Sequence, residues 1–125
     1  MRIGDVRAVN DSLQRLVAAL EPDAVPVFAA PALCAEFAEV KTLAASAAVL
    51  LASRVEQACT WKREGFRSAA EQLASGMGTS VASARTMLET SKRVAELPAT
   101  ADAMRSGSLS VEKAQLIASA ATHRP

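Results

Sequence analysis

The chain contains no tyrosine, one tryptophan and only 3% aromatic residues. Runs of β-branched residues are also rare in it. Aromatic and β-branched side chains are the ones that favour strands, so this composition argues against a β-sheet. Half of the residues are hydrophobic, and 28 of them are alanine, the residue with the highest helix propensity. The composition therefore predicts an all-α protein with a packed core.

Histidine occurs once, as His123 in the C-terminal tail, and is expected to be exposed to solvent. Neither a catalytic triad nor a metal-ligand cluster can be built without a placed histidine or clustered ligands. Glu36 and Glu39 lie one helical turn apart, but two solvated acidic residues explain them. No glycine-rich phosphate loop follows a strand, because no strand is predicted. We therefore expect no catalytic residue, no metal and no cofactor in this chain.

The two cysteines, Cys34 and Cys59, lie at opposite ends of one predicted helix. A helix of that length rises about 37 Å, whereas a disulfide requires a Cα separation of roughly 4.4–6.8 Å. We expect no disulfide between them, and we interpret both as small hydrophobic residues buried in the core.

The net charge is only +1, which by itself indicates neither a nucleic-acid nor a membrane partner. Residues 1–60 hold five basic and seven acidic residues, and residues 61–125 hold nine and six, so the second half is mildly basic. The N-terminus lacks the apolar segment of a signal peptide. The twelve uncharged residues between Lys41 and Arg54 fall short of the roughly 20 needed to span a bilayer. We expect a cytoplasmic protein with no membrane contact and no small-molecule substrate.

About six helices are predicted, the first from about Asp5 to Leu20. Pro22 and Pro26 end it, and a long central helix over residues 32–62 follows. The apolar residues of the long helix fall on two faces. The first stripe is Leu33, Phe37, Val40, Ala44, Ala47 and Leu51; the second is Leu43 and Leu50. Two apolar faces indicate burial on both, which we interpret as packing within the chain together with homodimerisation through helix 32–62.

Two helical hairpins are predicted after a break at Gly65. In the first, Ser68 caps a helix to Met77, and Ser80 caps a helix to about Glu96. In the second, Pro98 opens a helix that Gly107 ends, and Ser110 caps the last helix. The hairpins echo each other, because residues 70–76 parallel residues 101–107 and Ser80–Ala84 parallels Ser110–Ala114. The repeat could reflect an old duplication, or two hairpins that each require a glycine stop, a serine cap and a small crossing residue.

The first hairpin has the spacing of a helix-turn-helix motif. Ala74 and Ala84 take the positions of the two small crossing residues, and Gly78 takes that of the turn glycine. Ser80 takes the N-cap position, and Met87 takes that of the core hydrophobic residue. If Ser80 starts a recognition helix, the positions that face the groove are Ser80, Val81, Ala82, Arg85, Thr86 and Glu89.

The motif suggests double-stranded DNA as a partner. Arg85 could read a guanine edge, and Ser80 or Thr86 could hold a phosphate. Backbone contacts could come from Arg67, Lys92 and Arg93. The alternative is a structural or dimerising helical domain that does not contact nucleic acid, with its hairpins packed on the long helix.

Trp61 and Phe66 allow two interpretations. They could cap the core where the long helix meets the hairpins. They could also form a base-stacking platform beside Lys62, Arg63 and Arg67.

Five segments closely resemble domain of unknown function 222, a helical region common in actinobacteria that typically precedes an HNH nuclease domain. They are Trp61-Lys62-Arg63-Glu64-Gly65-Phe66-Arg67-Ser68-Ala69-Ala70-Glu71-Gln72-Leu73-Ala74, Gly78-Thr79-Ser80, Glu96-Leu97-Pro98-Ala99-Thr100, Gly107-Ser108-Leu109-Ser110 and Ile117-Ala118-Ser119-Ala120-Ala121. The resemblance is sharp over residues 60–125 and looser over residues 1–59.

The length and the helical pattern predict one helical domain over residues 1–125, with a helical pair in 1–64 and the hairpins in 65–125. The resemblance implies that the chain is an N-terminal fragment of a longer protein. An HNH site needs a histidine base, a metal ligand and an orienting asparagine in a compact fold. His123 and Asn10 lie at opposite ends of the chain, so nuclease activity is implied only for complete relatives.

Overall fold

The computed structural model describes residues 1–122, and over these residues it contains seven α-helices and no strand. The all-α prediction is confirmed. The helices are α1 (Ile3–Ala18), α2 (Ala30–Ala58), α3 (Thr60–Arg63), α4 (Ala69–Met77), α5 (Val81–Val94), α6 (Pro98–Arg105) and α7 (Val111–Thr122). The chain divides into two compact units, Met1–Ala35 and Glu36–Pro125.

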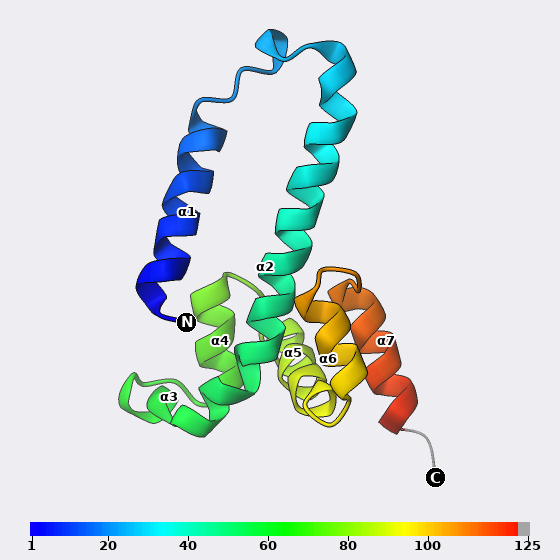
Figure 1. The fold of residues 1–125 in the computed structure, drawn as a ribbon. Helices are drawn as coiled ribbons and strands as arrows, with labels where there is room; N and C mark the ends of the chain where they lie inside the picture. Colours follow the sequence, from blue (N-terminus) through cyan, green and yellow to red (C-terminus); the bar gives the residue numbers. More distant parts are fainter. Residues whose placement is uncertain (123–125) are drawn as a thin grey trace. The chain divides into compact units, whose positions relative to one another are not determined.

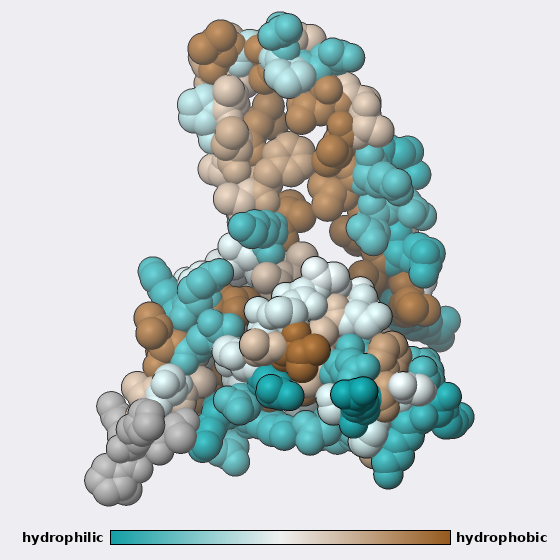
Figure 2. All heavy atoms as spheres, turned by 180° about the vertical axis from the view of Figure 1, so that it is seen from behind, coloured by the Kyte–Doolittle hydropathy of each residue, from teal (hydrophilic) through white to brown (hydrophobic). Residues whose placement is uncertain are grey.

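The first unit holds α1, two single-turn 3-10 helices and the start of α2. The 3-10 helices cover Pro22–Ala24 and Val27–Ala29, so the prolines end α1 close to the predicted position. No residue of α1 is buried, and Val9 remains 67% exposed. Figure 2 shows many hydrophobic residues on the surface of this unit.

The long helix ends at Ala58, four residues earlier than predicted, because Cys59 adopts a left-handed conformation with φ of 56°. This break separates α2 from the short α3 and gives seven helices instead of six. The predicted burial of the cysteines is wrong, since Cys34 and Cys59 are both exposed. Cys34 lies in a stretch of α2, residues 31–40, that has no buried residue, and Cys59 lies at the break itself.

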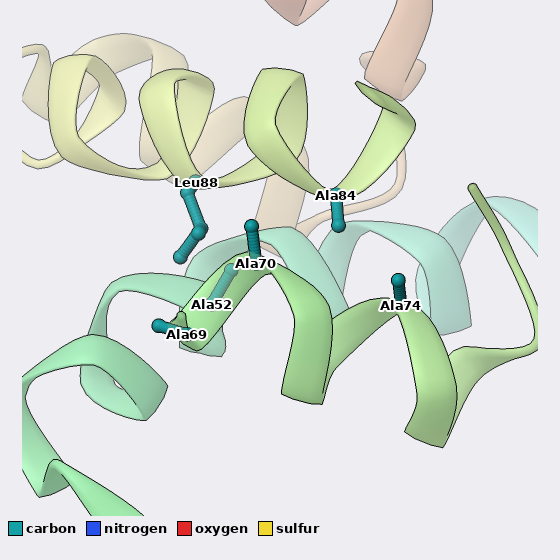
Figure 3. Packing of buried hydrophobic residues seen from close by; sticks show 6 residues of the cluster. All are labelled: Ala52, Ala69, Ala70, Ala74, Ala84 and Leu88. Atoms are coloured by element: carbon teal, nitrogen blue, oxygen red, sulfur yellow. The ribbon is translucent and has the colours of Figure 1, made fainter. Parts of the chain in front are cut away.

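In the second unit, α3 to α7 gather around the C-terminal part of α2 (Figure 1). The helix α5 is central, because it contacts α4, α6 and α7. Five alanines and one leucine form the first core cluster (Figure 3): Ala52, Ala69, Ala70, Ala74, Ala84 and Leu88. The second cluster is Val49, Val94, Ala101, Met104 and Ala114. So many alanines let the helix backbones approach closely, and the geometry of each crossing then depends on single methyl groups.

Glycines in the left-handed conformation end α4 and α6. Gly78 has φ of 68° and Gly107 has φ of 77°, whereas Gly76 lies within α4. The structural counterpart of Gly107 is therefore Gly78, although the sequence repeat pairs Gly107 with Gly76. The buried residues still echo each other, since Ala84 and Ala114 are both fully buried.

Substitution by alanine should change the free energy of unfolding in opposite directions at Gly76 and Gly78, the two glycines of the first hairpin. We expect Gly76→Ala to raise the free energy of unfolding by up to about 1 kcal/mol, because Gly76 is helical and its missing Cβ would meet no atom within 4 Å. Gly78→Ala should lower it by about 1–2 kcal/mol, since alanine strains a left-handed position. Urea unfolding followed by circular dichroism measures both, and effects of equal sign would contradict the assignment of the turn.

Two buried serines form a second matched pair. Among the described residues 1–122, the buried hydroxyl of Ser46 has no hydrogen-bond partner. Ser91 Oγ, by contrast, accepts a hydrogen bond of 3.0 Å from the Ser53 backbone N–H and links α5 to α2. Ser46→Ala should raise the free energy of unfolding by about 1 kcal/mol, and Ser91→Ala should lower it by about the same amount. The same urea titration compares them, and a loss of stability in Ser46→Ala would show that its hydroxyl is satisfied.

Candidate nucleic-acid interface

The first hairpin consists of two helices joined by a short turn, as in a helix-turn-helix motif. Residues 78–80 alone join α4 to α5, and Ser80 Oγ caps α5 by accepting a 3.0 Å hydrogen bond from the Ser83 backbone N–H. Ser68 Oγ caps α4 in the same way, at 3.1 Å from the Glu71 nitrogen. Both predicted caps are confirmed, and their satisfied N–H groups set where each helix begins.

The two helices cross on their small residues. Figure 3 shows Ala74 of α4 and Ala84 of α5 on the facing sides of the two helices, and both are buried. Met87, the predicted core hydrophobic residue, is half-buried and packs against both clusters. The five positions that suggested the motif therefore have the structural roles predicted for them.

One side of α5 packs in the core and the other side is exposed. The buried residues are Ala84, Leu88, Thr90, Ser91 and Val94. The residues expected to face a groove are all exposed: Ser80, Val81, Ala82, Arg85, Thr86 and Glu89.

The three polar groups at the start of this face differ in how freely they could bind a ligand. The Ser80 hydroxyl donates to Ser83 Oγ at 2.9 Å, and Thr86 Oγ1 donates to the Ala82 carbonyl at 3.2 Å. Within residues 1–122, Arg85 forms no ion pair. Its guanidinium is thus free to donate to a ligand, while the two hydroxyls retain mainly acceptor capacity.

The other three basic residues predicted to contact DNA are Lys92, Arg93 and Arg67, and their surroundings differ from those of Arg85. Lys92 Nζ is 2.8 Å from Glu56 Oε2, so Lys92 ties α5 to α2 and part of its charge is neutralised. Arg93 lines a hollow of about 570 Å³ between α5 and α7. Arg67 is exposed and immediately precedes the Ser68 cap of α4.

The hollow between α5 and α7 carries balanced charge. Its charged lining residues are two acidic and two basic ones: Glu89, Glu96, Lys92 and Arg93. Their charges cancel, so the hollow has no electrostatic preference for phosphate. The part of α5 that is both open and basic is its N-terminal half.

Trp61 and Phe66 are both half-buried, and Trp61 packs against the first core cluster. Lys62 Nζ lies 5.4 Å from the centroid of the Trp61 ring, within range of a cation–π interaction. The structure therefore favours the core cap over the base-stacking platform.

Sequence reasoning missed the polar links that hold the helices together. Gln72 Nε2 of α4 donates to Thr60 Oγ1 at 2.9 Å and to Glu64 Oε2 at 2.7 Å, which connects α4 to the α3 region. The Glu56–Lys92 ion pair and the Ser53–Ser91 hydrogen bond connect α2 to α5. No local pattern marks these residues, because their partners lie 8 to 38 positions away.

Among residues 1–122, no group of three or more His, Cys, Asp or Glu side chains is placed to hold a metal ion. His123 lies outside the described residues. In the same part of the chain, no helix combines the length and apolar character needed to cross a membrane.

The chain belongs to the DUF222 family, a domain of unknown function, which matches residues 32–125. The match confirms the family resemblance. It includes α3 to α7 and nearly all of α2, and α1 lies outside it. No curated protein and no solved structure matches the chain significantly.

The crossing of α4 on α5 should tolerate no larger side chain. We expect Ala84→Leu to lower the free energy of unfolding by about 1–3 kcal/mol, because Ala84 is fully buried between helices. Ala82→Leu, two residues earlier on the exposed face, should change it by less than about 0.5 kcal/mol. Thermal unfolding of the two variants measures this difference, and similar effects would contradict the close crossing.

Proposed function

We propose that this domain is a non-catalytic, cytoplasmic module that binds double-stranded DNA through the N-terminal half of α5. The observation that carries the proposal is the division of α5 into two sides. Its packed side is held by the core, and its opposite side presents the guanidinium of Arg85, which forms no ion pair within residues 1–122, beside the first turn of the helix.

The geometry fits the way in which helix-turn-helix domains bind DNA. The N-terminal residues of the second helix contact base edges in the major groove. Arg85 is five residues after the Ser80 cap and is exposed, so it can donate two hydrogen bonds to guanine O6 and N7. Arg67, at the start of α4, and Arg93 are the candidates for contacts to the phosphate backbone.

The charges indicate that such binding would be modest. Lys92 is engaged with Glu56, and the acidic side chain of Glu89 lies on the same exposed side as Thr86. Few phosphates would therefore be neutralised, and the slope of affinity against salt would be shallow. A second DNA-contacting element would be needed for tight binding.

That second element is proposed from the family resemblance. Residues 60–125 resemble the helical region that precedes HNH nuclease domains in actinobacterial proteins. In such a protein this domain would place the nuclease on its substrate, and the catalytic histidine and metal ligands would belong to the nuclease domain.

A second candidate function is that of a structural or dimerising helical domain. It is favoured by the apolar residues that stay exposed along α2, and it does not require DNA contact.

Fluorescence anisotropy with labelled duplexes of varied sequence tests the DNA proposal. We expect binding that weakens with salt, and Arg85→Ala should weaken it about tenfold at the preferred sequence, because a base contact is lost. Arg105→Ala is the matched control, since Arg105 carries the same charge on α6 and pairs with Asp102 at 2.7 Å. It should change the affinity by less than about twofold.

Two results would contradict the proposal. The first is the absence of binding to any duplex at low salt. The second is an equal loss in Arg85→Ala and Arg105→Ala, which would show that net charge alone is responsible.

A further inference from the structure

The side of α2 that faces away from the core carries a continuous apolar stripe. This outer stripe consists of Leu33, Phe37, Val40, Ala44, Ala47 and Leu51, and every member is exposed. Its largest side chains remain 38–49% exposed, for example Phe37 at 38% and Leu51 at 49%. The core of the second unit does not use this side, because the buried residues of α2 are Ser46, Val49 and Ala52.

The spacing of the outer stripe is the one that two helices need to pack along their length. Successive members are 4, 3, 4, 3 and 4 residues apart, which is a heptad repeat with Phe37, Ala44 and Leu51 at the a positions. The remaining members occupy the d positions. The helix has 29 residues, and the apolar repeat runs along it from Leu33 to Leu51, after which the charged Arg54 takes the next d position.

The charged residues beside the stripe are complementary to those of a second copy of α2 that runs in the same direction. In this repeat Glu36 takes a g position and Lys41 takes the e position of the next heptad. In a parallel, in-register pair of such helices, a g residue lies beside the e residue five positions later in the partner. Glu36 of each copy would thus pair with Lys41 of the other, twice by symmetry.

An antiparallel pair lacks this complementarity. If the stripe lay on itself in the opposite direction, with Leu33 facing Leu51, Glu36 would face Ala48 and Lys41 would face Leu43. Neither charge would then meet its opposite. Within residues 1–122, Glu36 and Lys41 form no ion pair, so both are available to a partner.

We propose that the outer stripe is a homodimer interface, in which the α2 helices of two copies pack in parallel and in register. The core side of each α2 points away from the stripe, so the core of each copy can stay intact in the dimer. The proposal stands independently of DNA binding, because it uses no residue of α5.

Sedimentation equilibrium of the whole chain tests the interface. We expect a dimer at micromolar concentration, and Ala47→Glu should raise the dissociation constant by about a hundredfold or more, because it places two carboxylates at facing d positions. Ala38→Glu is the matched control, since Ala38 is exposed on the same helix outside the stripe. It should leave the dissociation constant within about threefold of the original.

Circular dichroism shows whether each variant stays folded, and Ala47 is exposed, so the fold should survive. A wild-type chain that remains monomeric would overturn the proposal. If Ala47→Glu also lowered the stability of that monomer, another segment of the same chain would be the cover of the stripe.

Charge exchange tests the direction. Glu36→Lys and Lys41→Glu should each weaken the dimer about tenfold, and the double variant should recover to within about threefold, because the exchanged pair restores both contacts. Cysteine introduced by Leu33→Cys, with Cys34→Ser and Cys59→Ser, should form a disulfide between copies in a parallel dimer. A dimer that shows neither rescue nor this disulfide would overturn the parallel arrangement.

Discussion

The close approach of α4 and α5 is the constraint on which the second unit depends. Ala74 and Ala84 allow it, because both are buried on the facing sides of the two helices and each side chain is only a methyl group. The short 78–80 turn is possible only because Gly78 adopts a left-handed backbone at the end of α4. With α5 held in this way, the same helix is also in contact with α6 and α7. One small crossing thus positions most of the core.

As a consequence of this packing, α2 and α5 each have one side that packs in the core and one side that is exposed. The Glu56–Lys92 ion pair and the Ser53–Ser91 hydrogen bond join the two helices to each other. An ion pair that is about half exposed contributes little stability alone, and the buried residues of α5 are what face the core. The ion pair also engages the charge of Lys92, whereas within residues 1–122 Arg85 forms no ion pair.

The two proposals complement each other physically. One copy offers a single candidate base-reading arginine and few phosphate contacts, so its intrinsic DNA affinity would be low. Two copies joined through α2 would offer two α5 helices on one particle, as helix-turn-helix dimers do at paired half-sites. The gain would come from effective concentration, without any new contact to DNA.

The helix ends were predictable because they depend on neighbouring residues. The serines at 68, 80 and 110 each accept a hydrogen bond from a backbone N–H three positions later, and Gly107 ends α6. The exposure of Arg85 followed from the 3.6-residue period in the same way. The sequence by itself therefore determined the fold class, the hairpins and the family.

Tertiary structure decided the features that local signals do not encode. Cys59 adopts a left-handed conformation, which costs a non-glycine residue about 1–2 kcal/mol. No sequence rule therefore marks the end of α2 at this position. The sequence repeat pairs Gly107 with Gly76, but in the structure Gly76 lies inside α4 and Gly78 is the left-handed residue that ends it. The partner of Lys92 is 36 residues away, and Trp61 packs on the core instead of facing solvent. Each of these outcomes is set by contacts between distant segments, whose free energy outweighs the local preferences that a sequence reveals.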